Sequence, residues 1–125
     1  VPLPFNIGVW NGPDGKGLVS ILDATDYDGD ILPRLDIDSY WVDRLNKDRD
    51  KYGILFGYRY YGAGDMGGGI RERDLVNAEK SLNNPDSKLK VELTSSDQIF
   101  KDITPNIEKK LPVFSGDLFL VEHSA

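Results

Sequence analysis

The sequence predicts an α/β fold, in which βαβ units surround a mainly parallel sheet and a β-hairpin stands at the N-terminus. Two kinds of pattern alternate along the 125 residues. Strand patterns, with alternating apolar residues or short β-branched and aromatic runs, occupy residues 5–22, 54–61, 89–93 and 118–121. Helical patterns, with apolar residues three or four positions apart, occupy residues 38–52, 70–82 and 95–104. This order is typical of right-handed crossovers between parallel strands.

The composition indicates one domain and narrows its partners. A chain of 125 residues with 39% hydrophobic content is long enough for one core but not for two. Lys and Arg number 15 against 21 Asp and Glu, and this acidic balance argues against nucleic acid as a partner. No apolar run approaches the roughly 20 residues of a membrane span. Because the chain has no cysteine, it gives no sign of its compartment, which stays open between periplasmic or secreted and cytoplasmic.

The first 22 residues predict the hairpin. Apolar residues alternate with polar residues or glycine from Phe5 to Val9, and residues 11–15 read Asn-Gly-Pro-Asp-Gly, which is a turn sequence. Trp10 at the hairpin tip either fills the core or forms a platform on which a sugar ring stacks.

An acidic loop follows at residues 23–33. Asp26, Asp28 and Asp30 stand at alternate positions, which resembles a calcium-binding loop. However, Gly29 comes too early for an EF-hand, and no glutamate closes the loop at its twelfth position. We therefore expect a solvated acidic loop.

Capping residues set the limits of the predicted helices. Asp38 is suited to cap the N-terminus of the first helix, which ends at Gly53. The second ends at residues 83–85, Asn-Asn-Pro, and the third begins at a capping box, residues 95–98, before Pro105 bends or ends it. The side chains expected on the buried faces are Trp41, Leu45 and Tyr52 in the first helix, Leu75, Ala78 and Leu82 in the second, and Ile99, Phe100 and Ile103 in the third.

Between the second strand pattern and the second helix, five glycines surround one carboxylate, Asp65, at residues 62–69. Glycine lets a ligand approach the backbone closely, so this corner predicts a loop that presents Asp65 to a neutral, hydroxyl-rich ligand. A flexible connection with a turn-forming aspartate is the alternative. The dinucleotide pattern Gly62-x-Gly64-x-x-Gly67 is matched, but Asp65 and the net charge of -6 would repel a pyrophosphate. No Gly-Lys-Ser/Thr follows, which excludes a P-loop.

Three blocks of sequence together resemble the bacterial-type α-mannosidases of glycoside hydrolase family 38. Residues 62–69 are similar to that family's Gly-x-Gly-Asp-Gly-Gly-Gly-Gly loop, and residues 10–15 resemble its aromatic Gly-Pro-Asp-Gly hairpin. Residues 111–118 resemble its Leu-Pro-x-x-x-Gly-(Glu/Asp)-Leu/Phe strand, and the three blocks keep the family's order. The chain departs from the family at Met66, where the family has glycine, and at residues 70–71, where Ile-Arg replaces Pro-Thr.

The resemblance implies a segment excised from the barrel-like (β/α) catalytic domain of a retaining enzyme that acts on mannose-containing glycans. It implies that Asp65 is the catalytic acid/base or a substrate ligand. The residues expected around the sugar are Gly64, Asp65, Gly67, Gly68, Tyr61 and Trp10. It assigns no metal ligand to this chain, because the zinc of the parent enzyme would be held by residues outside it. His123, the sole histidine, is expected at the surface.

Two further expectations follow. The segment alone should be inactive, and the strand edges exposed by excision should favour self-association. The alternative to a mannosidase segment is a non-catalytic α/β domain that binds a carbohydrate or a protein.

Overall fold

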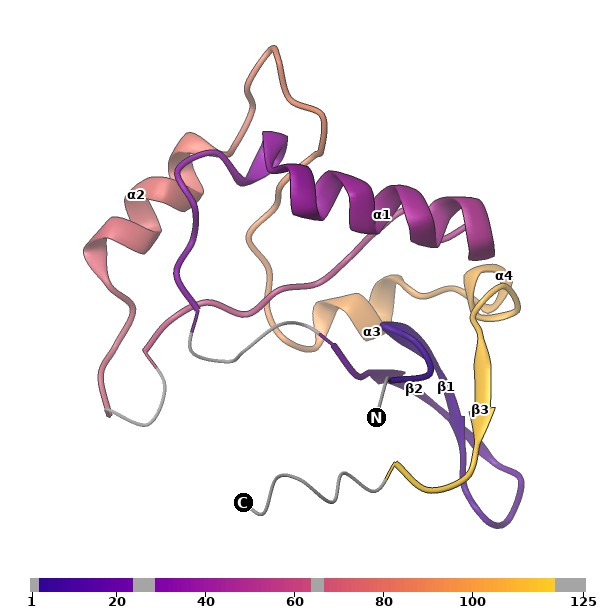
Figure 1. Ribbon diagram of the computed structural model, residues 1–125. Coiled ribbons are helices and arrows are strands. Elements are labelled where there is room, and N and C mark those ends of the chain that lie inside the picture. Colours follow the sequence, from indigo (N-terminus) through magenta and orange to yellow (C-terminus); the bar gives the residue numbers. More distant parts are fainter. Residues whose placement is uncertain (1–2, 24–28, 64–66, 119–125) are drawn as a thin grey trace.

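The chain forms a small α/β fold with a three-stranded mixed open sheet and four α-helices in the residues that the computed structural model describes, 3–23, 29–63 and 67–118 (Figure 1). The strands are β1 (Ile7–Asn11), β2 (Gly17–Ile21) and β3 (Val113–Ser115). The helices are the 3-10 helix η1 (Leu35–Ile37) and the α-helices α1 (Ser39–Tyr52), α2 (Glu72–Lys80), α3 (Gln98–Asp102) and α4 (Pro105–Glu108). The α/β class is confirmed, whereas the barrel-like arrangement is not confirmed and stays a prediction.

β1 is the central strand of the sheet, whose order is β2-β1-β3. β1 and β2 form the predicted antiparallel hairpin, in which the Gly12 N–H donates to the Lys16 carbonyl at 2.9 Å and Gly15 takes a φ of 76°. β3 runs parallel to β1, with Val113 opposite Val9. The parallel sheet expected from βαβ units is therefore reduced, in the described residues, to one pair of strands.

Two runs that were expected to be strands, residues 54–61 and 89–93, are not paired as strands. Burial alternates at the start of the first run. Ile54 belongs to the core, whereas the next residue, Leu55, is 76% exposed. The apolar pattern was therefore read correctly as one buried face, but a strand also needs a neighbour for its backbone, and the described residues supply none. The strand expected at residues 118–121 lies, apart from Leu118, outside the described residues.

The core lies where the sheet meets α3 and the start of the 54–61 segment. Its buried members are Ile7, Ile54, Ile99 and Leu111. Partly buried side chains pack around them: Val9, Val19, Ile21, Tyr52, Phe56, Tyr58 and Ile103. Apolar burial of this kind is the main stabilising term for a domain of this size.

α1 follows the prediction closely. Asp38 caps its N-terminus, since the carboxylate accepts a hydrogen bond from the Trp41 N–H at 3.0 Å. Gly53 ends the helix with a φ of 70°, which suits glycine because it has no Cβ. Trp41 is buried, as expected.

α2 has the predicted position but a different buried face. Asp74 and Ser81 are fully buried together with Ala78, whereas Leu75 is 46% exposed. The prediction that Leu75 lines the buried face was therefore wrong. The physical reason is that α2 packs against residues 31–35, whose buried backbone groups take hydrogen-bond partners from α2.

α3 and α4 take the place of the third predicted helix. Ile99 is buried as expected, but Phe100 is 46% exposed, contrary to the prediction. The capping-box prediction fails because α3 begins only at Gln98 and its N-cap, Asp97, makes no side-chain capping bond, while the Ser95 hydroxyl donates to Asp97 instead. Pro105 opens α4 at its first turn, where its missing N–H costs nothing, and the Thr104 hydroxyl caps that turn.

Candidate functional site

The glycine-rich corner, residues 62–69, connects the extended run at residues 54–61 to α2. The structure describes its two ends, residues 62–63 and 67–69, which we call its arms. Gly62 is buried with a φ of 136°, and its N–H donates to the Gly29 carbonyl at 3.0 Å. Gly67 has a φ of 63°. These two positions need glycine because other residues rarely adopt such angles. Gly64 and Asp65, the central residues of the predicted site, lie outside the described residues.

The two described arms of the corner come close together. A Cβ added to Gly68 would lie 3.2 Å from the Cβ of Ala63, which is tighter than ordinary van der Waals contact. Glycine at this position therefore lets the arm that leads to α2 approach the arm that leaves the extended segment. Tyr61, on the incoming arm, is partly buried.

An ion-pair cluster joins both flanks of the corner to Asp30. Arg73 Nη2 lies 2.5 Å from Asp30 Oδ2, and Arg71 pairs with the other carboxylate oxygen. From the opposite flank, Arg59 donates to the backbone carbonyl of Asp30. The hydrogen bond from Arg73, together with the charges of both arginines, holds the pKa of Asp30 below its usual range, although partial desolvation opposes this.

Asp30 is 49% exposed, which agrees with the predicted solvated loop, but it also forms ion pairs that the prediction did not include. Asp26 and Asp28, its partners in the rejected calcium pattern, lie outside the described residues. No local pattern predicts this pairing, because 41 and 43 positions separate Asp30 from Arg71 and Arg73.

α2 holds the segment before η1 through a row of polar side chains that we call the polar stripe: Asp74, Asn77 and Ser81. Asp74 Oδ1 accepts a hydrogen bond from the Ile31 N–H at 2.9 Å, and Asn77 Nδ2 donates to the Ile31 carbonyl at 2.8 Å. Ser81 Oγ accepts from the Leu35 N–H at 2.9 Å. The stripe thus satisfies backbone groups that would otherwise be buried without partners.

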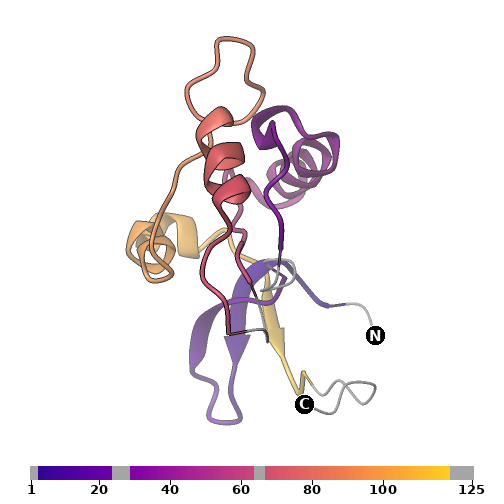
Figure 2. The ribbon, with the colours of Figure 1, turned by 90° about the vertical axis from the view of Figure 1, so that its left-hand side faces the viewer.

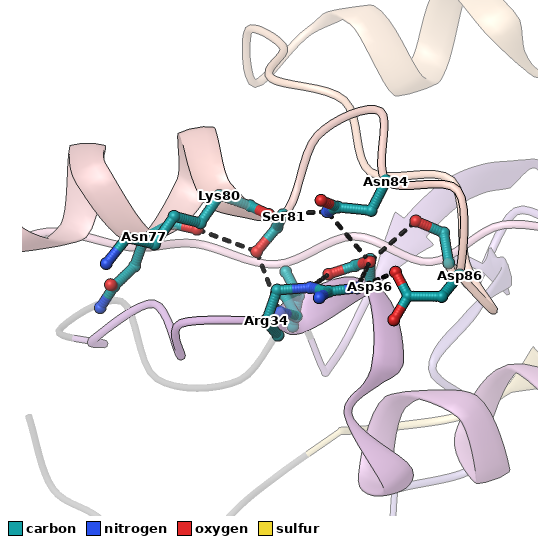
Figure 3. Close-up of polar contacts among 9 residues, drawn as sticks. Arg34, Asp36, Asn77, Lys80, Ser81, Asn84 and Asp86 are labelled. Carbon is teal, nitrogen blue, oxygen red and sulfur yellow. Dashed lines mark hydrogen bonds and ion pairs between the residues drawn. The ribbon is translucent and has the colours of Figure 1, made fainter.

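Just beyond the stripe, a buried carboxylate is enclosed by side chains from two parts of the chain, residues 34 and 84–87 (Figure 3). Asp36 is fully buried, and Arg34 binds it with two hydrogen bonds, Nε to Oδ1 at 2.9 Å and Nη2 to Oδ2 at 2.8 Å. Ser87 Oγ and Asn84 Nδ2 donate to Oδ2 at 2.8 and 3.2 Å. The Arg34 hydrogen bonds hold the pKa of Asp36 far below its usual range, against the effect of burial.

The stripe and the Asp36 cluster position the candidate site. Both fix residues 31–36, and the residues just before them, Gly29 and Asp30, hold the two flanks of the glycine corner. Sequence reasoning missed this arrangement because it looked for apolar faces on helices. The available signal was the spacing of Asp74, Asn77 and Ser81, which places all three on one face of a helix.

Trp10 lies at a second location, on the sheet. It is 36% exposed, so it does not fill the core, and its Nε1 donates to the Gly116 carbonyl at 2.7 Å. The neighbouring Asn11 donates from Nδ2 to Ser115 Oγ at 3.1 Å. These bonds fix the indole ring across β1 and β3, with Phe114 opposite Trp10 in the register.

Two of the three family-like blocks, residues 10–15 and 111–118, therefore lie side by side, although about 100 positions separate them. The third block lies apart. In Figure 1, residues 67–69 stand at the lower left, across the molecule from the strands. Trp10 and the glycine corner are thus not brought together by any contact among the described residues.

The described residues were compared with the requirements of a metal site, a ligand groove and a membrane-spanning helix. No group of three or more His, Asp or Glu side chains within residues 3–23, 29–63 and 67–118 could hold a metal ion. His123 lies outside the described residues. A shallow groove of about 340 Å³ is lined by Val9, Pro105, Glu108 and Lys109, away from the glycine corner. Over the same ranges, no helix is long and apolar enough to cross a membrane.

Comparison of the chain with protein-family models, with curated proteins and with solved structures found no match in any of the three.

Proposed function

We propose that this chain is a segment of the barrel-like catalytic domain of a retaining, metal-dependent α-mannosidase, and that the parent protein hydrolyses α-mannosidic bonds in glycans. The observation that carries the proposal is the resemblance of three ordered blocks to glycoside hydrolase family 38. The pairing of β1 with β3 places the first and last blocks side by side, although the described arms of the glycine corner lie apart from both.

Asp65 has the central role in this proposal. A retaining glycosidase needs two carboxyl groups, a nucleophile and an acid/base, about 5–5.5 Å apart. Within this chain Asp65 is the candidate for the acid/base or for a ligand of a mannose hydroxyl, and Gly64, Gly67 and Gly68 would leave room for the sugar ring. The nucleophile and the zinc ligands would come from sequence outside the chain.

The direct test uses a polypeptide that comprises this chain and the adjoining coding sequence. We expect it to hydrolyse an aryl α-mannoside and to lose this activity on treatment with a chelator. A well-folded polypeptide that hydrolyses no α-mannoside would contradict the proposal.

In the same polypeptide, the leaving group distinguishes the two roles of Asp65. As acid/base, Asp65→Asn should lower the rate about 10²–10⁴-fold for a poor leaving group and much less for an activated one. As a substrate ligand, it should affect both substrates similarly and partly through KM. Asp50→Asn, at an exposed position of α1 outside all three blocks, is the matched control. Near-normal kinetics of Asp65→Asn on both substrates would remove the corner from the active site.

The fixed, exposed indole of Trp10 favours a second candidate function, a non-catalytic carbohydrate-binding surface. Aromatic rings stack on sugar faces, and the adjacent pair of Asn11 and Ser115 can exchange hydrogen bonds with hydroxyls. Titration of the 125-residue chain with a mannose oligosaccharide, followed by NMR, tests it. Binding that survives Leu18→Ala but not Trp10→Ala would support this function, and the absence of any shift around Trp10 would contradict it.

A further inference from the structure

The segment at residues 54–61 has the surroundings of an interior strand but lacks the neighbours of one. The backbone N–H and C=O groups of its eight residues make no hydrogen bond within the described structure. Backbone groups of a β-rich run need partners when they are removed from water. An extended run without neighbours is therefore a template for a strand from elsewhere.

Side chains cover parts of both faces of this segment. On one face, Phe56 and Tyr58 pack against the core that includes Ile99 of α3. On the other face α1 passes so close that a Cβ on Gly57 would lie 2.8 Å from Leu45 Cδ2. In Figure 1 the segment turns back from the end of α1 and runs beneath it, and Figure 2 shows α1 and α3 on opposite sides of the molecule. Contacts thus occupy the faces, while the backbone of this run makes no hydrogen bond among the described residues.

The edge is accessible at its centre. Gly57 is exposed although α1 blocks its Cβ position, so its exposed surface is backbone. Leu55 and Tyr60 on either side are 76% and 42% exposed. An incoming strand would therefore reach the backbone near Gly57 and cover two apolar side chains that now face water.

We propose that residues 54–61 form a self-association site, at which a second copy of this chain adds its own 54–61 segment as an antiparallel strand. Charge favours a second copy, because the segment contains no acidic residue and its one charge, Arg59, is held by the Asp30 carbonyl. The paired segments therefore bring no unpartnered like charges together. A pairing centred on Gly57 places Phe56 opposite Tyr58, which is a favourable aromatic pair.

The size and charge of the interface predict its behaviour. A single pair of eight-residue strands is smaller than a standard interface of about 1,600 Å², so we expect weak association, with a Kd on the order of 100 μM. The negative charges behind the net charge of -6 on each copy all lie outside the segment, so added salt should screen the repulsion between copies and strengthen the dimer.

Sedimentation of the 125-residue chain, with Leu55→Pro compared with Leu55→Ala, tests the site. Both variants lose the exposed leucine side chain, but only proline removes the N–H that would pair with the second copy. We expect the wild type and Leu55→Ala to dimerise and Leu55→Pro to raise the Kd about tenfold over Leu55→Ala. Equal association of the two variants would place the contact elsewhere, for example at the outer edge of β2, and would overturn the proposal. A wild-type monomer at all concentrations would overturn it too.

Hydrogen exchange of the wild-type chain provides a test that does not depend on the folding of a variant. Amides of residues 54–61 should gain protection as the protein concentration rises through the Kd, while those of β1 should not change. Protection that is independent of concentration would count against a second copy as the occupant.

Discussion

Replacing the buried Asp36 with alanine is the sharpest test of how the glycine corner is held. The carboxylate accepts hydrogen bonds from Arg34, Asn84 and Ser87, and all of them lose their acceptor in Asp36→Ala. Removing one partner of a buried ion pair costs about 3–5 kcal/mol. The lower end applies, because the Arg34 side chain is 33% exposed and keeps Asp86 as a partner. We therefore expect a loss of about 3 kcal/mol in the free energy of unfolding.

Urea denaturation followed by circular dichroism measures this loss, which corresponds to a fall in Tm of roughly 10 °C. Asp86→Ala is the matched control, since it removes the exposed partner of the same arginine and should cost less than about 1 kcal/mol. If the two variants lost equal stability, or if Asp36→Ala lost less than the control, the Asp36 cluster would not be what holds residues 31–36.

Three further predictions concern the corner glycines, Leu75 and the unmodified chain. Gly62→Ala should destabilise the chain by about 1–2 kcal/mol because of its φ of 136°, whereas Gly69→Ala, in open space at an ordinary φ, should not; equal urea midpoints would contradict this. Leu75→Lys should leave the unfolding free energy within about 0.5 kcal/mol, and a loss above about 2 kcal/mol would show that Leu75 is buried after all. The 125-residue chain alone should neither bind zinc tightly by calorimetry nor hydrolyse an aryl α-mannoside, and chelator-sensitive turnover would refute this.

Local signals in the sequence were sufficient for the elements that depend on them. Asp38 and Gly53 limit α1 through hydrogen bonds and backbone angles that are decided within a few residues. The turn at residues 11–15 fixes the hairpin in the same way. These predictions needed no knowledge of distant contacts.

Features that depend on residues far apart in the sequence could not be predicted from local patterns. The apolar pattern of residues 54–61 shows which side chains face the core, but it does not show whether a neighbouring strand exists. Leu75 was expected to be buried because helices usually bury apolar faces, yet α2 packs against the backbone of residues 31–35 and buries Asp74 and Ser81 instead. The pairing of Asp30 with Arg73 could not be predicted either, because charge spacing in a sequence predicts ion pairs only between residues three or four positions apart on a helix.

At low pH, the region held by the Asp36 and Asp30 ion pairs should unfold before the apolar core of the sheet. The pKa of Asp36 is lowered in the folded chain, as is that of Asp30, so their stabilising contribution is complete above the ordinary carboxyl pKa of about 3.9 and is lost as the pH falls below it. The core of the sheet contains no titratable group among its buried members. The amides of Lys88 and Leu89, which donate to the Asp36 carbonyl, should therefore lose exchange protection between about pH 4 and pH 2, while the hairpin amide of Leu22 keeps its bond to Asn6. Protection factors measured by hydrogen exchange across this pH range test whether the two sets of amides lose protection at different pH values. Loss of both sets at the same pH would mean that the ion pairs and the apolar core unfold as one unit, and that the glycine corner has no separate support.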